Sequence, residues 1–131
     1  MPKKQKPAGI LAMESVGQPF STCVQIGNHF HFSGTVGRVV DGRVVGDLEE
    51  QIEEIFTKMD SMLGVCELYP DDVFSATILL AGDMSGYGLV NTSWNLFFRS
   101  AEIMPRRKAY AVSALPFDAL IEIEFDAVKQ D

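Results

Sequence analysis

The chain has 131 residues, of which 47% are hydrophobic, and a formal net charge of -7 at pH 7. This length fits one domain, and the hydrophobic fraction excludes an intrinsically disordered chain. The negative charge opposes broad binding to a nucleic-acid backbone, because that binding depends on Lys and Arg displacing counterions. No apolar run approaches the roughly 18 residues that a membrane-spanning helix needs.

The N-terminal sequence MPKKQKP is basic but lacks the apolar stretch of a signal peptide. Cys23 and Cys66 are isolated and have no CxxC or Cys/His spacing, so we expect free packing thiols in a reducing compartment. His29 and His31 lack a third neighbour of a ligand type, which favours packing or exposure over metal binding. These features favour a cytoplasmic protein with no metal site and no membrane partner.

The first predicted elements in chain order are strands. Residues 22–26 and 29–35 are rich in strand-forming residues and flank a Gly-Asn turn pair. Residues 38–45 contain the dipeptide Asp-Gly, which is typical of a tight hairpin turn. The N-terminal half of the chain is therefore predicted to contribute strands that are neighbours in sequence.

A first helix is predicted over residues 48–63, because apolar residues recur there at helical spacing. Asp47 and Glu50 form a capping-box pair at its start, and Gly64 is expected to end it. A second helix is predicted over residues 85–101, capped by a residue at position 83 or 85. Its aromatic stripe is more typical of a protein core than of a cofactor site.

The remaining segments are predicted to be strands. Residues 74–80 are nearly all apolar, as in a strand buried on both faces, and residues 108–114 form the next strand. Residues 120–128 alternate, so that the apolar residues face one side and the acidic residues face the other. The order of elements indicates an α+β fold in which two helices pack on one face of a single mixed sheet. Self-association would cover the rest of the sheet.

The strongest motif lies in the last quarter of the chain. Residues 105–116 are PRRKAYAVSALP, and residues 119–124 are ALIEIE. This pattern resembles the signature of the RidA/YjgF family, in which Pro-x-Arg-Ser/Thr leads through a strand to a Leu-Pro corner and an apolar-Glu-Ile-Glu strand. The resemblance extends over residues 15–129. We accordingly separate residues 1–14, an N-terminal tail with a first strand, from a RidA/YjgF-like domain at residues 15–131. The shorter agreeing blocks are PFS at 19–21, FSG at 32–34, VGD at 45–47 and VN at 90–91.

The resemblance implies a chorismate-mutase-like fold of the bacillus type and a homotrimer with active sites between its subunits. The implied activity is hydrolytic deamination of reactive 2-imino and enamine acids to 2-keto acids and ammonia, without a metal or an organic cofactor. By the same resemblance, Arg107 grips the substrate carboxylate and Glu122 activates water. The other positions that match the family's substrate-binding residues are Phe20, Gly34, Asn91 and Ala109.

Arg107 and Glu122 have side chains that suit this reaction. A planar guanidinium can hold a carboxylate through two parallel hydrogen bonds. A carboxylate can accept a proton from an attacking water and return it to the leaving nitrogen. We expect two adjacent antiparallel strands to hold the two groups rigidly, because rigid placement lowers the barrier.

A plainer interpretation stays open for several of these positions. Arg107 could be one of three adjacent surface cations, and Glu122 could belong to the solvated face of its strand, as we expect for the two later acidic residues. Gly34 could be a simple turn glycine instead of a point of close approach to ligand. Asn91 could cap local backbone instead of lining a pocket.

Three positions depart from the family pattern. Phe20 stands where many members have Tyr, Lys108 where Ser or Thr is usual, and Ala109 where some members have Cys. Lys108 should point to the opposite side of its strand from Arg107 if the strand is regular. These departures leave the preferred imino acid open.

Two other functions remain alternatives. The chain could be an endoribonuclease that inhibits translation, with the basic residues 106–108 contacting phosphate. The net charge of -7 and the lack of a histidine pair placed for acid–base catalysis oppose this. Alternatively, it could be a non-catalytic trimer that binds small carboxylic acids.

Overall fold

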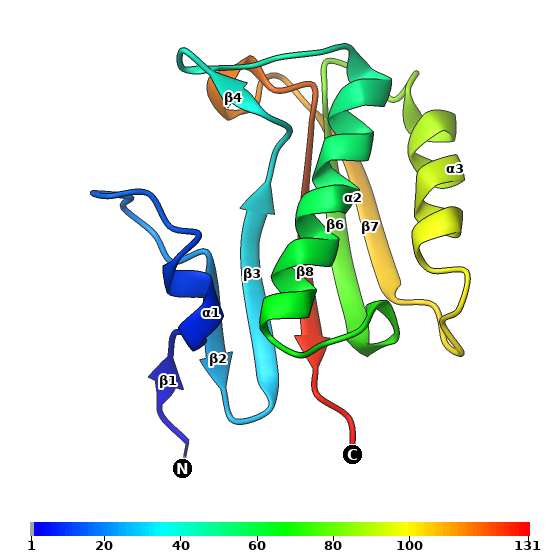
Figure 1. Cartoon of the computed structure of the whole chain (residues 1–131). Helices are drawn as coiled ribbons and strands as arrows, with labels where there is room; N and C mark the ends of the chain where they lie inside the picture. The colour runs from blue at the N-terminus through cyan, green and yellow to red at the C-terminus, as the bar shows by residue number, and fades with distance from the viewer. Residues whose placement is uncertain (1) are drawn as a thin grey trace.

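Two helices cover one face of a single mixed sheet in the computed structural model, which describes residues 2–131 (Figure 1). In spatial order, the six strands of the sheet are β1 (Lys4–Gln5), β2 (Cys23–Ile26), β3 (His29–Thr35), β8 (Ile121–Val128), β6 (Val73–Ala81) and β7 (Arg106–Val112). β6 and β7 are parallel, and all other neighbouring pairs are antiparallel. The predicted α+β class with one mixed sheet is confirmed.

The first long helix, α2 (Leu48–Val65), begins at the predicted residue. The backbone N–H of Glu50 donates to the Asp47 carboxylate, and the Glu50 carboxylate accepts from the backbone N–H of Asp47. This capping box satisfies N–H groups that have no partner within the first helical turn. Gly64 does not end the helix as predicted. The left-handed backbone that follows the helix occurs at Glu67, with φ of 58°.

The second long helix, α3 (Tyr87–Phe97), is shorter than the predicted span of residues 85–101. Asp83 accepts a hydrogen bond from the backbone N–H of Ser85, so this carboxylate closes a turn before the helix and does not cap it. Trp94 is buried, as the aromatic stripe predicts. α3 thus keeps its predicted buried face over fewer turns.

The predicted hairpin at residues 38–45 forms a separate two-stranded ribbon, β4 (Val39–Val40) and β5 (Arg43–Val44). Asp41 and Gly42 occupy its turn with positive φ angles of 50° and 77°. This conformation is the one that a type I′ turn requires. The hairpin lies beyond the end of β3, at the top of the view in Figure 1.

The N-terminal segment contributes to the main core. β1 pairs with β2, and a short helix that the sequence did not predict, α1 (Ala8–Leu11), follows it. Ile10 in this helix is fully buried in the main hydrophobic cluster. Helix α1 therefore packs against the same core as the two long helices, whereas β1 is exposed.

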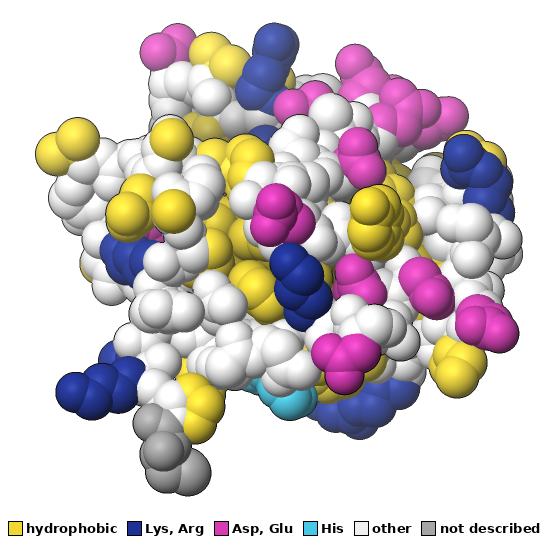
Figure 2. Space-filling model, turned by 60° about the horizontal axis from the view of Figure 1, so that its bottom comes forward, with side chains coloured by type: hydrophobic (Ala, Val, Ile, Leu, Met, Phe, Trp, Pro, Cys, Tyr) yellow, Lys and Arg dark blue, Asp and Glu magenta, His cyan; other side chains and the backbone are white. Residues whose placement is uncertain are grey.

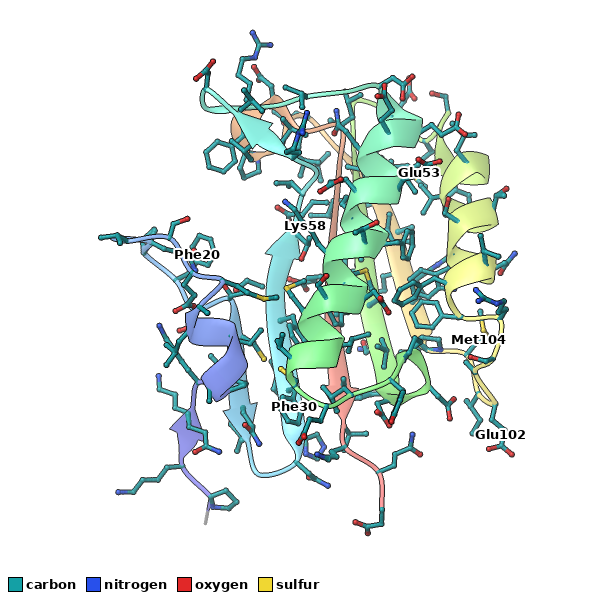
Figure 3. All side chains as sticks on the ribbon, in the orientation of Figure 1. Phe20, Phe30, Glu53, Lys58, Glu102 and Met104 are labelled. Carbon is teal, nitrogen blue, oxygen red and sulfur yellow. The ribbon has the colours of Figure 1, made fainter. Side chains whose placement is uncertain are left out.

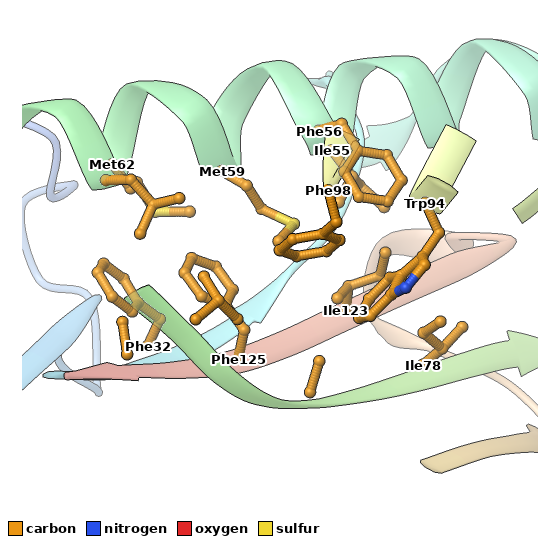
Figure 4. Close-up of a cluster of buried hydrophobic side chains, with 14 of the residues drawn as sticks. Phe32, Ile55, Phe56, Met59, Met62, Ile78, Trp94, Phe98, Ile123 and Phe125 are labelled. Carbon is orange, nitrogen blue, oxygen red and sulfur yellow. The ribbon is translucent and has the colours of Figure 1, made fainter. Parts of the chain in front are cut away.

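The hydrophobic core lies between the sheet and the two long helices (Figure 4). The rings of Phe32 and Phe125 stack with their centroids 4.3 Å apart, and those of Trp94 and Phe98 lie 4.5 Å apart. Stacked and tilted aromatic pairs stabilise a core beyond the area that they bury. This packing fixes α3 against the sheet close to the edge strand β7.

The opposite face of the sheet is not covered by any helix or strand of residues 2–131. The prediction that β6 is buried on both faces is therefore only half right, since Phe74 on the uncovered face is 40% exposed. Tyr110 of β7 on the same face is 49% exposed. Within the described residues, no helix combines the length and apolarity needed to cross a bilayer.

Candidate active site

Arg107 lies on the edge strand β7 and points toward α3. Arg107 pairs with Ala76 in the register of β7 and β6, and Ala76 pairs with the core residue Phe125 in the register of β6 and β8. All three side chains therefore lie on the helix-covered face. The guanidinium donates a hydrogen bond to the hydroxyl of Tyr87. Its Cζ atom lies 4.8 Å from the centroid of the Trp94 ring and 5.3 Å from that of Tyr87.

These contacts hold the Arg107 guanidinium without neutralising its charge. Cation–π contact and one hydrogen bond orient the group, but neither aromatic ring carries a negative charge. The ion pairs formed among residues 2–131 do not include Arg107. The half-buried guanidinium is therefore oriented and available to bind an anion.

Two other predicted residues lie beside Arg107. Asn91 is half-buried one helical turn after Tyr87, so it projects from the same face of α3. Ala109 lies two residues after Arg107 on the same side of β7 and packs against the core. We call Arg107, Tyr87, Asn91, Trp94 and Ala109 the arginine group.

Glu122 lies on the opposite face of the sheet, next to Gly34 of β3. A Cβ atom at position 34 would lie 2.6 Å from Cδ of Glu122 and 2.7 Å from its Oε2. Only glycine therefore permits this approach of the strand to the carboxylate. The group close to Gly34 within the chain is the Glu122 carboxylate, and the expected approach of a ligand to Gly34 stays a prediction.

Burial disfavours the charged form of the Glu122 carboxylate. Partial burial raises the pKa of Glu122, and the nearby Glu124 carboxylate raises it further. Both effects act in the same direction, because desolvation and a like charge each penalise ionisation. A carboxyl group with a raised pKa exchanges protons more readily near neutral pH than an ordinary glutamate does.

Glu122 opens into a cavity of about 330 Å³, which we call the glutamate pocket. Its lining residues are Phe20, Ser33, Gly34, Val36, Pro116, Phe117 and Glu122. A second cavity of about 470 Å³ shares four of these residues and extends to Lys58 of α2. Sequence patterns identified neither Val36 nor Phe117 as a lining residue, because neither carries a reactive group or a recognisable spacing.

Lys58 supports the strand end that carries Gly34. Its Nζ donates to the carbonyl oxygens of Val36 at 3.0 Å and Gly37 at 2.8 Å, and burial lowers its pKa. Figure 3 shows Lys58 on the side of α2 that faces the end of β3. No sequence pattern predicted this role for Lys58, since the two carbonyls belong to a loop.

Arg107 and Glu122 face opposite sides of the sheet within the described part of the chain. β6 lies between β7 and β8, so the prediction that adjacent antiparallel strands hold them is wrong. Glu122 is level with Leu79 on the uncovered face, whereas Arg107 is level with Ala76 on the helix-covered face. The structure thus places the predicted site residues in two separate sets: Phe20, Gly34 and Glu122 in one, and Asn91, Arg107 and Ala109 in the other.

None of the predicted site residues, all of which the structure describes, lines the groove between α2 and α3. This groove of about 590 Å³ is lined by residues that include Glu53, Asp60 and Arg99. Among residues 2–131, no cluster of three His, Cys, Asp or Glu side chains could hold a metal ion. His31 instead contacts the Asp126 carboxylate through Nδ1 at 2.8 Å.

Comparisons with known proteins agree on one family. A sequence model of the family described as endoribonuclease L-PSP matches residues 11–129. A mouse protein named 2-iminobutanoate/2-iminopropanoate deaminase is 33% identical over 113 residues, which cover 85% of this chain and 82% of that protein. A RutC family protein from Aquifex aeolicus is 29% identical over 112 residues, covering 85% of this chain and 89% of that protein.

Solved structures support the same relationship. The Rid family protein YyfA from Yersinia pestis aligns with a TM-score of 0.85 at 27% identity, covering 97% of this chain and all of that chain. The yjgF gene product of E. coli aligns with a TM-score of 0.77 at 27% identity, covering 88% of this chain and 91% of that chain.

Proposed function

Because this chain belongs to the endoribonuclease L-PSP family, which includes the RidA and YjgF proteins, we propose that it hydrolyses 2-imino and enamine acids to 2-keto acids and ammonia. The names of related imine deaminases support a hydrolase of this kind. The observation that carries the proposal is that each of the two predicted sets of site residues supplies only part of what the reaction needs. The arginine group offers an oriented cation, and the glutamate pocket offers a half-buried carboxyl group.

A 2-imino acid needs both sets at once, because its carboxylate is bonded directly to the imine carbon. Within one chain Arg107 and Glu122 face opposite sides of the sheet. We infer that the arginine group of one subunit meets the glutamate pocket of another. The uncovered sheet face and the unpaired edge of β7 are consistent with such self-association, and the family resemblance implies a homotrimer.

Arg107 would bind and orient the substrate. Its guanidinium can hold the carboxylate through two parallel hydrogen bonds, while the hydroxyl of Tyr87 and the ring of Trp94 keep it in place. Ala109 offers no thiol and no bulk beside the bound group. This anchoring would present the imine carbon toward Glu122 and convert the reaction with water into an oriented step.

Glu122 would transfer the protons. The ionised carboxylate accepts a proton from water as the water oxygen bonds to the imine carbon, and the imine nitrogen takes a proton from solvent. In the resulting carbinolamine, the Glu122 carboxyl group returns its proton to the nitrogen, the carbon–nitrogen bond breaks to release ammonia, and the hydroxyl proton passes to solvent as the carbonyl forms. One water is consumed, and one 2-keto acid and one ammonia are released. No step requires a metal or an organic cofactor.

The positions that depart from the family pattern leave this scheme intact. Phe20 lines the glutamate pocket but supplies no hydroxyl. Lys108 is level with Thr77 and Glu124 on the uncovered face, so it points away from Arg107 as expected. It therefore adds no second cation to the arginine group.

One observation weighs against the ribonuclease alternative. The three cations at residues 106–108 alternate across β7, so Arg106 and Lys108 face one side of the sheet and Arg107 faces the other. They do not form one phosphate-binding patch. Figure 2 also shows acidic side chains scattered over the face in view, without a continuous basic stripe.

A coupled assay tests the proposal. A threonine dehydratase would supply 2-iminobutanoate, and the appearance of 2-oxobutanoate would be followed with and without this protein. We expect a clear acceleration that is lost in Glu122→Gln while 2-keto acid binding is kept. No acceleration by the parent protein, with tight carboxylate binding, would instead support a non-catalytic binder. RNA cleavage that disappears in Arg107→Ala would support the ribonuclease.

A further inference from the structure

The glutamate pocket is mostly apolar, and Ser33 and Glu122 are its polar side chains among the described residues. Phe20, Val36, Pro116 and Phe117 form most of its wall, and Glu122 is the one ionisable residue among the residues within 2–131 that line it. A small imino acid would leave most of a cavity of about 330 Å³ unfilled once its carboxylate is held by Arg107. A substrate of three or four carbons would therefore contact only part of the apolar surface of this wall.

Phe117 is placed in this wall by an unusual backbone conformation. Its φ of 59° and ψ of 27° are left-handed, and the next residue, Asp118, has φ of 55°. Bulky side chains rarely adopt this conformation, and such exceptions cluster at active sites and ligand-binding loops. Phe117 is nevertheless 54% exposed, so packing within the chain does not account for its position.

Contacts on both sides hold the turn that carries Phe117. The Gln51 side chain accepts a hydrogen bond from the backbone N–H of Leu120 at 2.9 Å, and Gln51 is itself buried. The Asp118 carboxylate pairs with Arg43 of the hairpin at 3.0 Å. The end of the turn is therefore tied to α2 through the buried Gln51, and a solvent-exposed ion pair links it to β5.

Phe20 faces the same cavity from the loop that precedes β2. The Gln18 amide donates to the carbonyl oxygen of Phe20 at 2.8 Å and to the hydroxyl of Thr22 at 3.0 Å. Phe20 is 55% exposed and also lines the larger cavity that extends toward Lys58 (Figure 3). Two half-exposed aromatic rings on anchored loops thus border the carboxyl group of Glu122.

We propose that the aromatic wall formed by Phe117 and Phe20 selects 2-imino acids with large apolar side chains, either branched aliphatic or aromatic. This inference rests on the proposed function and specifies its substrate class. Oxidation of the corresponding amino acids, which releases the imino acid directly, is the class of reaction that would supply such substrates. Each methylene buried against the wall should raise kcat/KM roughly fourfold, so leucine- or phenylalanine-derived imines should exceed the alanine-derived imine by at least about tenfold.

The test compares three imino acids on matched variants. An L-amino-acid oxidase with catalase would generate the imines of alanine, leucine and phenylalanine, and semicarbazide trapping would measure how fast each disappears. Phe117→Ser should lower kcat/KM for the two large imines at least tenfold and change that for the small imine less than twofold. Tyr69→Ser, which removes an aromatic ring that is 74% exposed elsewhere, should change neither.

A binding measurement separates failure of this inference from failure of the proposed function. 4-Methyl-2-oxopentanoate and phenylpyruvate should bind more tightly than pyruvate, and Phe117→Ser should remove the difference. No hydrolysis of any imine, with this binding order intact, would overturn the proposed reaction but keep the pocket assignment. Equal binding of all three keto acids, or a Phe117→Ser variant that changes oligomeric state without changing selectivity, would overturn the assignment.

Discussion

Replacing Gly34 by alanine would place a methyl group 2.6 Å from Cδ of Glu122 and 2.7 Å from Oε2. Ordinary contact for a Cβ atom begins near 3.4 Å, so the carboxyl group would have to move by roughly 1 Å. A shift of this size in a reacting group costs roughly 100-fold in rate, so kcat/KM for imine hydrolysis should fall by about that factor.

The same substitution should leave the fold nearly as stable as before. Gly34 does not have a positive φ, so alanine suits its backbone, and the atom that must move is the end of a flexible side chain. We expect a change of about 1 kcal/mol or less, which shifts Tm by no more than about 5 °C. Gly64→Ala is the matched control, because a Cβ atom there meets nothing within 4 Å in a helix.

The parent protein, Gly34→Ala and Gly64→Ala would be compared by stopped assays of 2-keto acid release and by thermal unfolding. Gly64→Ala should keep full activity and gain about 0.5–1 kcal/mol, the usual advantage of alanine over glycine in a helix. If Gly34→Ala hydrolyses imines at the parental rate, the position of the Glu122 carboxylate does not control the reaction. The role proposed for Glu122 would then be wrong.

Three further substitutions test other parts of the reasoning. Arg107→Lys should lower kcat/KM roughly 10- to 100-fold, because it loses one of two charge-assisted hydrogen bonds worth about 1.5–3 kcal/mol, and 2-keto acid titrations should show matching weaker binding. For Glu122, the raised folded-state pKa means that the acidic limb of the kcat/KM profile of the parent protein should lie above the ordinary range of a glutamate, as assays across the acidic pH range would show. Ionisation of Glu122 is less favourable in the folded than in the unfolded state, so its raised pKa destabilises the folded parent at neutral pH but not in acid. Glu122→Gln should therefore be slightly more stable than the parent at neutral pH and equal to it in acid, as urea titrations at both pH values would show. Ile10→Ala should cost about 2–4 kcal/mol of unfolding free energy if α1 belongs to the main core, and a loss below about 1 kcal/mol would place it outside.

Local patterns predicted the elements well where neighbours in sequence determine them. The capping box at Asp47 fixes the start of α2 because both partners lie within one helical turn. The alternation of β8 and the opposite orientations of Arg107 and Lys108 follow from the pleat of a strand. Such features can be predicted from the local sequence alone, without knowing which segments pack against them.

The remaining features depend on contacts between distant segments. Placing β6 between β7 and β8 follows from how α2 and α3 pack on the sheet, and no local pattern contains that information. The four-residue helix α1 is too short to show a period, so only its contact with the core defines it. The left-handed turn at Phe117 goes against the preference of its own residue and is imposed by its anchors.

The orientation of Arg107 and Glu122 on opposite sides of one sheet has a genetic consequence. If neighbouring subunits complete each site, a chain damaged only at Arg107 and a chain damaged only at Glu122 carry defects that can compensate for one another. Random co-assembly of equal amounts would pair an intact arginine with an intact glutamate in about one site in four. Two inactive variants, when co-expressed, should therefore recover about a quarter of the parental activity, whereas each alone has none.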